Sequence, residues 1–301
     1  MPKFPIRNML VAGILLMLAG DFMFALNDAM GKWLVASFSV GQVVFVRSIG
    51  SFFILGPMIV HQGAAKLFHM DRLGLQILRV IATTLDTVLF YAAVVYLPLA
   101  DVMSFYMAGP IYVAALSHFL LGEKVGWRRW VAILVGFCGV LIMLKPSSAA
   151  FSLSSLFALV GSISFAVGIV LNRSLRGTSD TTLVTWQTVG AGLVGAVIAI
   201  GHWQPATSMD YGAMLLLGIV SGAAHLMITR ALKLAPASTL APLHYTLLLW
   251  AVVFGALFFS DFPGPRILIG AGIVVLAGLF IFHRQKVKDT VPPENVPKGV
   301  N

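Results

Sequence analysis

The sequence contains few charged residues. Asp, Glu, Lys and Arg together make up 10% of the 301 residues, whereas 59% of the residues are hydrophobic. A soluble globular domain has about 25% charged and 45–50% apolar residues. A chain this apolar cannot cover its surface with polar groups in water. The composition therefore excludes an ordinary soluble enzyme and predicts an integral membrane protein.

The sequence also lacks the motifs of most enzymes and metal sites. Its single cysteine, Cys138, lies in an apolar run, where we expect it to pack as a small residue. There is no P-loop, HExxH, GxSxG or Cys/His metal spacing. We therefore expect no enzymatic activity, cofactor, metal or nucleotide hydrolysis. The net charge of +9 belongs to loops between apolar runs, so it does not indicate nucleic-acid binding.

Apolar runs separated by polar residues predict an all-α integral membrane protein with ten transmembrane helices. At about 20 residues per span, ten helices use about 200 residues and leave no room for a soluble domain. The polar segment 284–301 is expected to be a disordered cytoplasmic tail. The ten predicted spans lie near residues 9–36, 42–60, 73–96, 99–121, 129–144, 152–172, 182–201, 211–232, 236–260 and 266–283.

The positions of the basic residues predict the orientation of the chain. If the N-terminus is cytoplasmic, fifteen of the twenty Lys and Arg residues lie on the inner side and three on the outer side. Lys and Arg favour cytoplasmic loops. The first span is too long for a cleavable signal peptide. We therefore expect a multi-pass protein of the inner (cytoplasmic) membrane, with both termini in the cytoplasm.

The chain also repeats itself at half its length. Each half, 9–144 and 152–283, holds five predicted spans, so the second half enters the membrane from the opposite side. Such an inverted 5+5 repeat is typical of secondary transporters. At an offset of 138 residues, the matched pairs are Pro98 and Pro236, Glu123 and Asp261, Gly126 and Gly264, and Arg128 and Arg266.

The repeated segments resemble a known family. LPLAD…LLGEKVGWRRWVAILVGFCGVLIML and LAPAS…FFSDFPGPRILIGAGIVVLAGLFIF are similar to the paired EamA domains of the drug/metabolite transporter superfamily. The resemblance covers residues 9–283 and implies ten helices, a central substrate cavity and no ATPase. Asp261 stands where the second domain more often has Glu, which keeps the charge. The family includes importers and exporters of many metabolites, so the resemblance leaves the substrate open.

Ionisable residues inside the spans are candidate functional groups, because each costs about 2.5–3.5 kcal/mol at the centre of a helix. Asp28 and Arg47 lie at similar depth and could pair as a gate, contact the substrate or only fix helix packing. Asp86 and His225 occupy nearly equivalent positions in the two halves. Either could bind a cationic group or a coupling proton, or be a buried group satisfied by Ser or Thr. Asp21 is also at mid-depth, but its sequence context does not indicate which way it faces.

Aromatic residues are frequent in the same spans. A ring with a polar tip suits a flat heteroaromatic solute, although the alternative is an interfacial belt or ordinary packing. Pro110 and Pro242 are expected to interrupt the fourth and ninth spans beside a cavity. The aromatic residues that we select as candidate substrate contacts are Tyr91, Tyr106, Trp186 and Tyr245.

These features predict a secondary transporter that moves a small organic metabolite by alternating access. The resemblance is strongest to the vitamin- and S-adenosylmethionine-uptake branch, so uptake of riboflavin or a similar heteroaromatic vitamin is the first expectation. An exporter of amino acids or drug-like metabolites is the alternative. An intramembrane enzyme would need a clustered nucleophile or metal site, and a channel would not need inverted halves. The expected partners are the solute, the lipid bilayer and a coupling proton.

Overall fold

The computed structural model describes residues 6–68, 72–120, 127–144, 152–175, 177–235 and 240–289. These residues form helices and turns, and they contain no strand. In chain order the helices are α1 (Ile6–Val35), α2 (Val40–Gln62), η1 (Ala64–Phe68), α3 (Leu73–Val94), α4 (Leu99–Tyr106), α5 (Gly109–Leu120), α6 (Trp127–Leu144), α7 (Leu153–Ser174), α8 (Asp180–Ala199), α9 (Ser208–Leu234), η2 (Ala241–Tyr245), α11 (Thr246–Phe259) and α12 (Pro265–Asp289).

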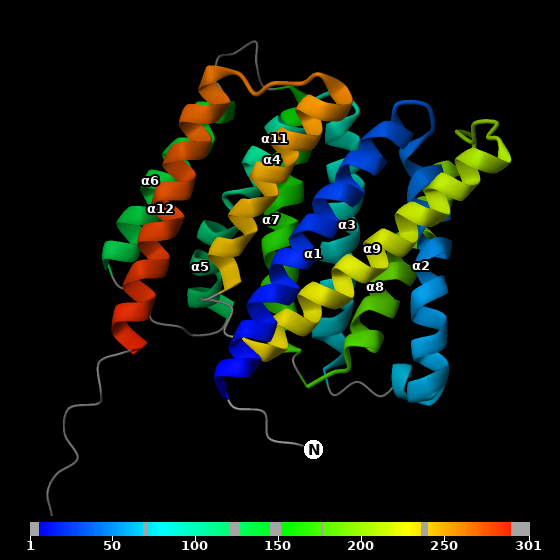
Figure 1. The fold of residues 1–301 in the computed structure, drawn as a ribbon, viewed down its shortest axis with the longest axis horizontal. Helices are drawn as coiled ribbons and strands as arrows, with labels where there is room; N and C mark the ends of the chain where they lie inside the picture. The colour runs from blue at the N-terminus through cyan, green and yellow to red at the C-terminus, as the bar shows by residue number, and fades with distance from the viewer. Residues whose placement is uncertain are drawn as a thin grey trace, which may run out of the picture.

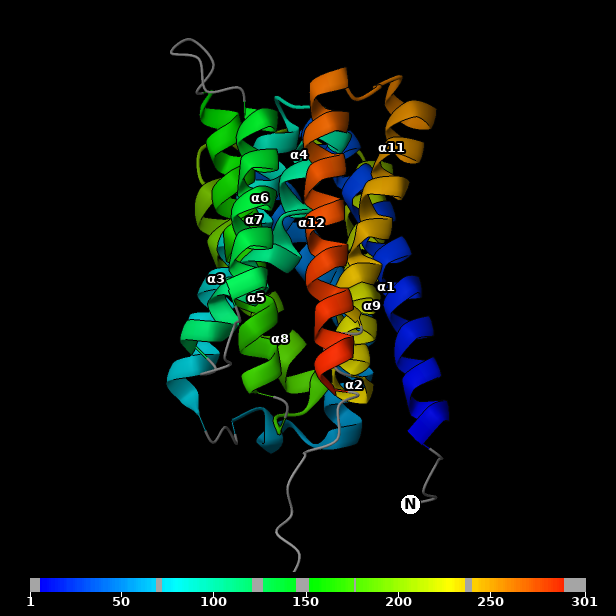
Figure 2. The same ribbon diagram turned by 90° about the vertical axis from the view of Figure 1, so that its left-hand side faces the viewer.

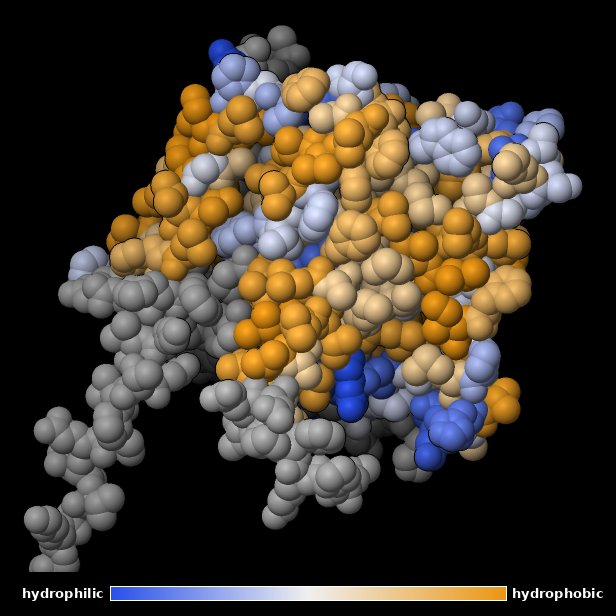
Figure 3. Space-filling view, in the orientation of Figure 1, coloured by the Kyte–Doolittle hydropathy of each residue, from blue (hydrophilic) through white to orange (hydrophobic). Residues whose placement is uncertain are grey.

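The helices account for the ten predicted spans, so the predicted fold class is confirmed (Figure 1). Six helices, α1, α2, α3, α7, α8 and α9, are each long and apolar enough to cross a membrane. The other four spans correspond to shorter apolar segments within α4 and α5, α6, η2 and α11, and α12: Leu99–Val113, Trp130–Gly139, Leu243–Phe259 and Pro265–Ala277. Apolar side chains cover most of the molecular face shown in Figure 3, as expected for a surface in contact with lipid.

Hydroxyl side chains set the start of four long helices. Ser39, Ser152 and Ser179 each accept a hydrogen bond from a backbone N–H in the first turn of α2, α7 and α8. Thr207 and Asp210 form a reciprocal capping box at the start of α9. In each case the side chain satisfies a backbone donor that has no partner inside the helix.

The fourth and ninth spans are interrupted, as the sequence predicted. α4 ends at Tyr106 and α5 begins at Gly109, directly before Pro110, because proline has no backbone N–H for the hydrogen bond that would continue the helix. Pro242 lies in the 3₁₀ helix η2, after which α11 begins at Thr246. The interruptions at Met107 and Tyr245 are separated by the repeat offset of 138 residues. Both halves therefore break their fourth span at equivalent positions.

The helix packing follows the inverted repeat. α1 packs along α9, and α3 packs along α7. α1 and α7 are equivalent helices of the two halves, and so are α3 and α9. The α1–α9 contact is therefore equivalent to the α3–α7 contact. α2 packs on its own equivalent α8, and α6 packs on its equivalent α12. The α6–α12 pair lies at one edge of the bundle in Figure 1 and faces the viewer in Figure 2. In Figure 1, α1 rises from the side where the N-terminus lies, whereas α7 descends from the opposite side.

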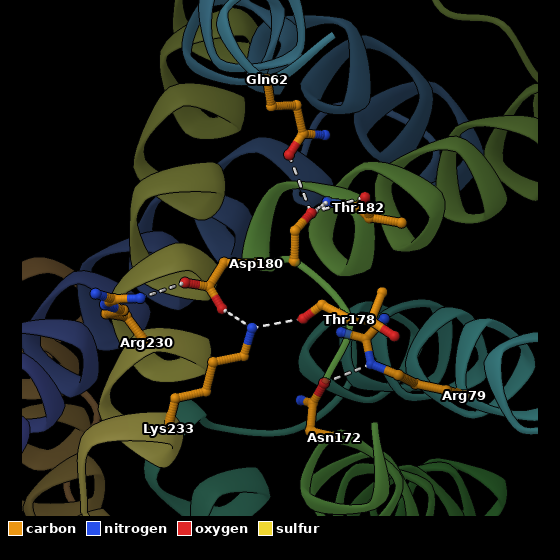
Figure 4. A network of polar contacts seen from close by, with 9 residues as sticks. Gln62, Arg79, Asn172, Thr178, Asp180, Thr182, Arg230 and Lys233 are labelled. Carbon is orange, nitrogen blue, oxygen red and sulfur yellow. Dashed lines mark hydrogen bonds and ion pairs between the residues drawn. The ribbon is translucent and has the colours of Figure 1, made fainter. Parts of the chain in front are cut away.

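Charged residues tie helices together at both ends of the bundle. At one end, Lys32 of α1 pairs with Asp261 in the turn between α11 and α12. At the other end, Lys233 of α9 contacts Asp180 of α8 at 2.5 Å and the Thr178 carbonyl oxygen at 2.6 Å (Figure 4). Both contacts link segments that are distant in the sequence.

Some sequence predictions fall on parts of the chain that are not described. Glu123 and Pro236, which mark the repeat, lie outside the described residues. α12 continues to Asp289, so helix extends into the segment 284–301 that the sequence predicted to be disordered. Residues 290–301 also lie outside the described residues.

Candidate functional site

A cavity lies between the two halves, with walls from α1, α2, α3 and α4 of the first half and α7, α9 and α11 of the second. Its accessible volume is about 50 Å³. One water molecule needs about 10–15 Å³, so this conformation has room for a few waters. The lining residues are Phe24, Asn27, Asp28, Arg47, Asp86, Thr87, Phe90, Tyr91, Met103, Tyr106, Phe165, His225 and Leu247.

Arg47 places a guanidinium group on the cavity wall, although its side chain is buried. Nη1 donates to the Tyr91 hydroxyl at 2.5 Å, and Nη2 donates to Ser221 Oγ at 2.8 Å. The Tyr91 ring centre lies 5.2 Å from Arg47 Cζ, within the range of a cation–π contact. Both hydrogen-bond partners are neutral. The positive charge of Arg47 is therefore available to an anionic group in the cavity.

Two glycines bring α2 and α9 together at Arg47. A Cβ atom on Gly218 would collide with the carbonyl group of Arg47, and one on Gly50 would collide with the backbone of α9. Ser51 Oγ donates to the Gly218 carbonyl oxygen at 2.8 Å. Small residues allow such close backbone contact in membrane helices. This contact brings Ser221 of α9 within reach of the guanidinium group.

Two carboxylates share the cavity with Arg47. Asp28 accepts a hydrogen bond from Asn27 Nδ2 at 3.0 Å, and Asp86 accepts one from the Tyr106 hydroxyl at 2.7 Å. The structure does not show the direct contact between Asp28 and Arg47 that the sequence suggested: among the described residues, no hydrogen bond or ion pair joins these two side chains. Arg47 instead uses Tyr91 and a serine of α9 as partners. The two acids and the arginine therefore line one space without neutralising one another directly.

Asp86 and His225 face the cavity from opposite halves. His225 Nδ1 lies 2.8 Å from the Ser221 carbonyl oxygen in the preceding turn, so this nitrogen carries a proton and donates. The His225 ring packs edge-on against Phe24, with 4.6 Å between ring centres. Thr87, which is separated from His225 by the repeat offset, lines the same cavity. The repeat thus places equivalent positions of α3 and α9 on one space.

Aromatic rings form one side of the cavity. Phe90 contacts Tyr91 and Tyr106 edge-on, with ring centres 5.5 and 5.6 Å apart. Phe165 of α7 lies 5.6 Å from Tyr106 by the same measure. Edge-on and offset aromatic contacts are favourable arrangements for rings. The cavity therefore combines formal charges with a surface on which a flat ring can stack.

Trp186 and Tyr245, also selected from the sequence, do not line this cavity. Trp186 Nε1 donates to the Leu67 carbonyl oxygen at 2.9 Å, and its ring lies 5.8 Å from that of Phe68. The Tyr245 hydroxyl points to the Val274 carbonyl oxygen of α12 at 3.5 Å. Trp186 therefore anchors η1 to α8, and Tyr245 joins η2 to α12.

The sequence analysis missed several residues of the cavity. It also missed Ser221, which does not line the cavity but accepts a hydrogen bond from Arg47; it lies four residues before His225 on the same face of α9, a spacing that could have identified it. Phe165 and Leu247 gave no comparable signal, because they are apolar residues in apolar spans. Their position becomes visible only when the helices are packed.

The comparison with known families agrees with this architecture. Residues 11–145 and residues 152–283 each match the EamA-like transporter family. The two matches together cover most of the chain and coincide with the two halves of the repeat. The chain belongs to the EamA-like transporter family. It is therefore a multi-pass membrane transporter, and its central cavity lies where its two EamA-like halves meet.

Relatives of this EamA-like transporter carry different substrate names. It is 27% identical to an S-adenosylmethionine uptake transporter of Rickettsia prowazekii, over 87% of this chain and 89% of the relative. It is 27% identical to a riboflavin transporter of Vibrio cholerae, over 92% and 94% of the two chains. It is 28% identical to a pseudopaline exporter of Pseudomonas aeruginosa, over 93% and 99%. These names describe transport of organic solutes but differ in substrate and direction.

A solved crystal structure supports the fold of this EamA-like transporter. It matches 93% of this chain and 99% of its own length, with a TM-score of 0.65. The sequence identity is 13%, so this likeness shows the fold alone.

Proposed function

We propose that this EamA-like transporter is a secondary carrier for an organic solute that combines a heteroaromatic ring with amino-acid charges. The observation that carries this proposal is the set of residues that line the cavity. Arg47, Asp28 and Asp86 line the same space as the aromatic rings of Tyr91, Tyr106 and Phe165. A solute with a carboxylate, one or more cationic groups and a ring has a counterpart there for each part.

The charge balance of the cavity favours a solute such as S-adenosylmethionine over riboflavin. With two carboxylates and one guanidinium, the wall carries a formal net charge of −1. S-adenosylmethionine has one carboxylate, one ammonium and one sulfonium group, so its net charge of about +1 complements the wall. Riboflavin, the first expectation from the sequence, has the required ring but no charges for Arg47, Asp28 and Asp86. It is retained as the competing substrate.

The contracted volume of the cavity supports alternating access. About 50 Å³ does not hold a solute of this size, so the walls must separate for binding. Tyr106 and Leu247 lie next to the interruptions in the fourth and ninth spans, and both line the cavity. We infer that the helix pieces at these interruptions move when the cavity opens to one side of the membrane.

A binding experiment distinguishes the candidate substrates. The purified transporter in detergent is heated with S-adenosylmethionine, S-adenosylhomocysteine, riboflavin or an amino acid. S-adenosylhomocysteine is a matched control, because it lacks the sulfonium charge but keeps the ring and the amino-acid group. We expect S-adenosylmethionine to raise the melting temperature most. A shift with riboflavin alone would replace the proposed substrate by the vitamin, and a shift with amino acids alone would favour the exporter alternative.

We further propose that the transporter lies in the cytoplasmic membrane with both termini inside, as the basic residues predicted. A reporter fused after Asn301 is expected to be active in the cytoplasm. A reporter inserted near Trp203, in the turn between α8 and α9, is expected outside. Detection of both reporters on one side would contradict the proposed orientation.

A further inference from the structure

A second set of buried polar groups lies away from the charged residues of the substrate cavity. Asp21, at the middle of α1, has no exposed surface. His244 of η2 lies with Nδ1 at 2.9 Å from Asp21 Oδ1, and Thr246 Oγ1 lies at 3.3 Å from Oδ2. Ionisable groups at this depth are costly and generally have a function. Neither Asp21 nor His244 lines the proposed substrate cavity.

His244 has one ring nitrogen without a partner. Its side chain is 9% exposed, and Nε2 is buried with no hydrogen-bond partner among the described residues. Since Nδ1 donates to Asp21, the neutral ring leaves a lone pair on Nε2. A buried acceptor without a partner is unfavourable, so Nε2 is a position at which a proton and a water molecule can be accommodated.

His244 borders a small cavity that shares wall residues with the substrate cavity. His244 lines a small second cavity of about 20 Å³, which is large enough for one water molecule. Tyr106, Phe165 and Leu247 line both this space and the substrate cavity. The His244 ring packs edge-on against Phe165, with 5.7 Å between ring centres. A movement of these shared wall residues would connect the histidine to water in the substrate cavity.

We propose that Asp21 and His244 form the proton-binding site that couples solute transport to a proton gradient. A hydronium ion in the small cavity transfers its proton to the His244 Nε2 lone pair, which forms an N–H bond and leaves water. The Nδ1–H group continues to donate to Asp21. The pair changes from a net charge of −1 to zero with one proton per cycle. This proposal rests on the proposed carrier function and replaces Asp86 or His225 as the predicted coupling site.

The charge change explains how the proton would control the conformation. A net negative charge at mid-membrane is strongly disfavoured unless it is neutralised. The protonated pair is a neutral ion pair and tolerates closure of the surrounding helices. His244 lies directly before the junction of η2 and α11, so movement of this junction separates it from Asp21 on α1. Proton release and opening of the carrier are thereby linked.

Among the described residues, none of the other titratable and charged groups on the helices that pack around Asp21 and His244 hydrogen-bonds or pairs with these two residues. The only other titratable group on the wall of the small cavity is Tyr106, which donates to Asp86. The remaining groups on these helices include Asp28 on α1, Arg47 on α2, Asp86 on α3, His225, Arg230 and Lys233 on α9, and Tyr245 on η2.

Transport in proteoliposomes tests the assignment. Labelled S-adenosylmethionine is followed as exchange at equal pH and as net accumulation under an imposed gradient of one pH unit. One coupled proton allows up to about tenfold accumulation, because one pH unit is a tenfold concentration ratio. In Asp21→Asn and His244→Gln we expect the accumulation ratio to fall to about 1 while exchange continues. Asp101→Asn, which changes an aspartate outside both cavities, should accumulate like the wild type.

The outcomes separate this inference from the proposed function. Tenfold accumulation in both site variants would overturn the proton site, as would wild-type net uptake that does not respond to the pH gradient. No exchange in the wild type would count against the proposed substrate instead. The proton site is then tested without substrate by ¹⁵N-histidine NMR, with His244→Gln to assign the signal. Spectra are recorded across a pH series, in which the proposal requires His244 to gain a proton at Nε2 and Asp21→Asn to alter that gain. A single protonation state throughout would overturn the inference.

Discussion

Arg47 and Arg79 are both buried arginines in predicted spans, but their surroundings differ. Arg79 is fully buried and has three neutral acceptors: Asn172 Oδ1 at 2.5 Å, the Leu183 carbonyl oxygen at 2.9 Å and Gln187 Oε1 at 2.8 Å. Figure 4 shows its contact with Asn172. Arg47 has two hydrogen-bond partners and borders a cavity that also contains two carboxylates.

The comparison shows that burial of a charge does not by itself identify a binding site. Arg79 uses its Nε, Nη1 and Nη2 atoms to hold α3 against α7 and α8, so its role is structural. Arg47 lines a cavity, makes only two side-chain hydrogen bonds among the described residues, and has partners on helices of both halves. A buried arginine is therefore a candidate binding residue when it borders a cavity and has N–H groups without a protein partner.

The largest expected effect on stability is at Arg79. Arg79→Ala leaves three buried acceptors without their donor, so we expect the free energy of unfolding to fall by about 3–5 kcal/mol. Thermal unfolding of the purified protein measures this loss. Arg47→Ala is the matched control and should cost less, because part of the Arg47 environment is a cavity. Equal losses in the two variants would contradict the distinction between them.

The largest expected effect on transport is at Arg47. In Arg47→Gln we expect the kcat/KM of solute uptake to fall about 100-fold, or about 2.7 kcal/mol, because the cationic partner of the solute carboxylate is lost. The melting temperature should change little. Uptake is measured per amount of correctly folded protein. A fall in uptake that only follows the loss of folded protein would assign Arg47 to packing, as for Arg79.

A smaller effect is expected at the hydroxyl group that positions Arg47. Tyr91→Phe removes the acceptor for Arg47 Nη1 and for Asn27 Nδ2 at 3.3 Å, but keeps the ring. We expect KM to rise about 5- to 10-fold, which corresponds to about 1–1.4 kcal/mol, within the range for one typical intramolecular hydrogen bond. Tyr106→Phe, which removes the donor to Asp86, provides the comparison on the acidic side. An unchanged KM in Tyr91→Phe would mean that Arg47 keeps its position without this bond.

The smallest effect is expected outside the cavity, at Trp186. Trp186→Phe keeps an aromatic ring next to Phe68 but removes the indole donor to the Leu67 carbonyl oxygen. Because Trp186 does not line the cavity, kcat and KM should change less than about twofold, and the free energy of unfolding by about 0.5–1 kcal/mol. A clear loss of solute affinity would restore Trp186 as a substrate contact.

The sequence by itself determined that this protein crosses a membrane ten times in two inverted halves. Hydropathy and the offset of 138 residues were sufficient, because lipid requires long apolar helices and a repeat preserves matched residues such as Gly126 and Gly264. Pro110 and Pro242 also indicated the interrupted spans, since proline removes a helical hydrogen bond. Six of the eight selected site residues line the cavity for a similar reason: polar residues are rare within spans and seldom face lipid.

Only the tertiary structure decided which partners these polar residues have. A residue in a span is surrounded by apolar groups whether it faces lipid or protein, so hydropathy does not indicate the direction of its side chain. Asp28 and Arg47 occupy similar depths, yet Arg47 bonds to Tyr91 and Ser221 instead. Asp21 gave no sign of its direction, and its contact with His244 joins residues 223 positions apart. Such pairings depend on the rotation and packing of whole helices, which local sequence does not specify.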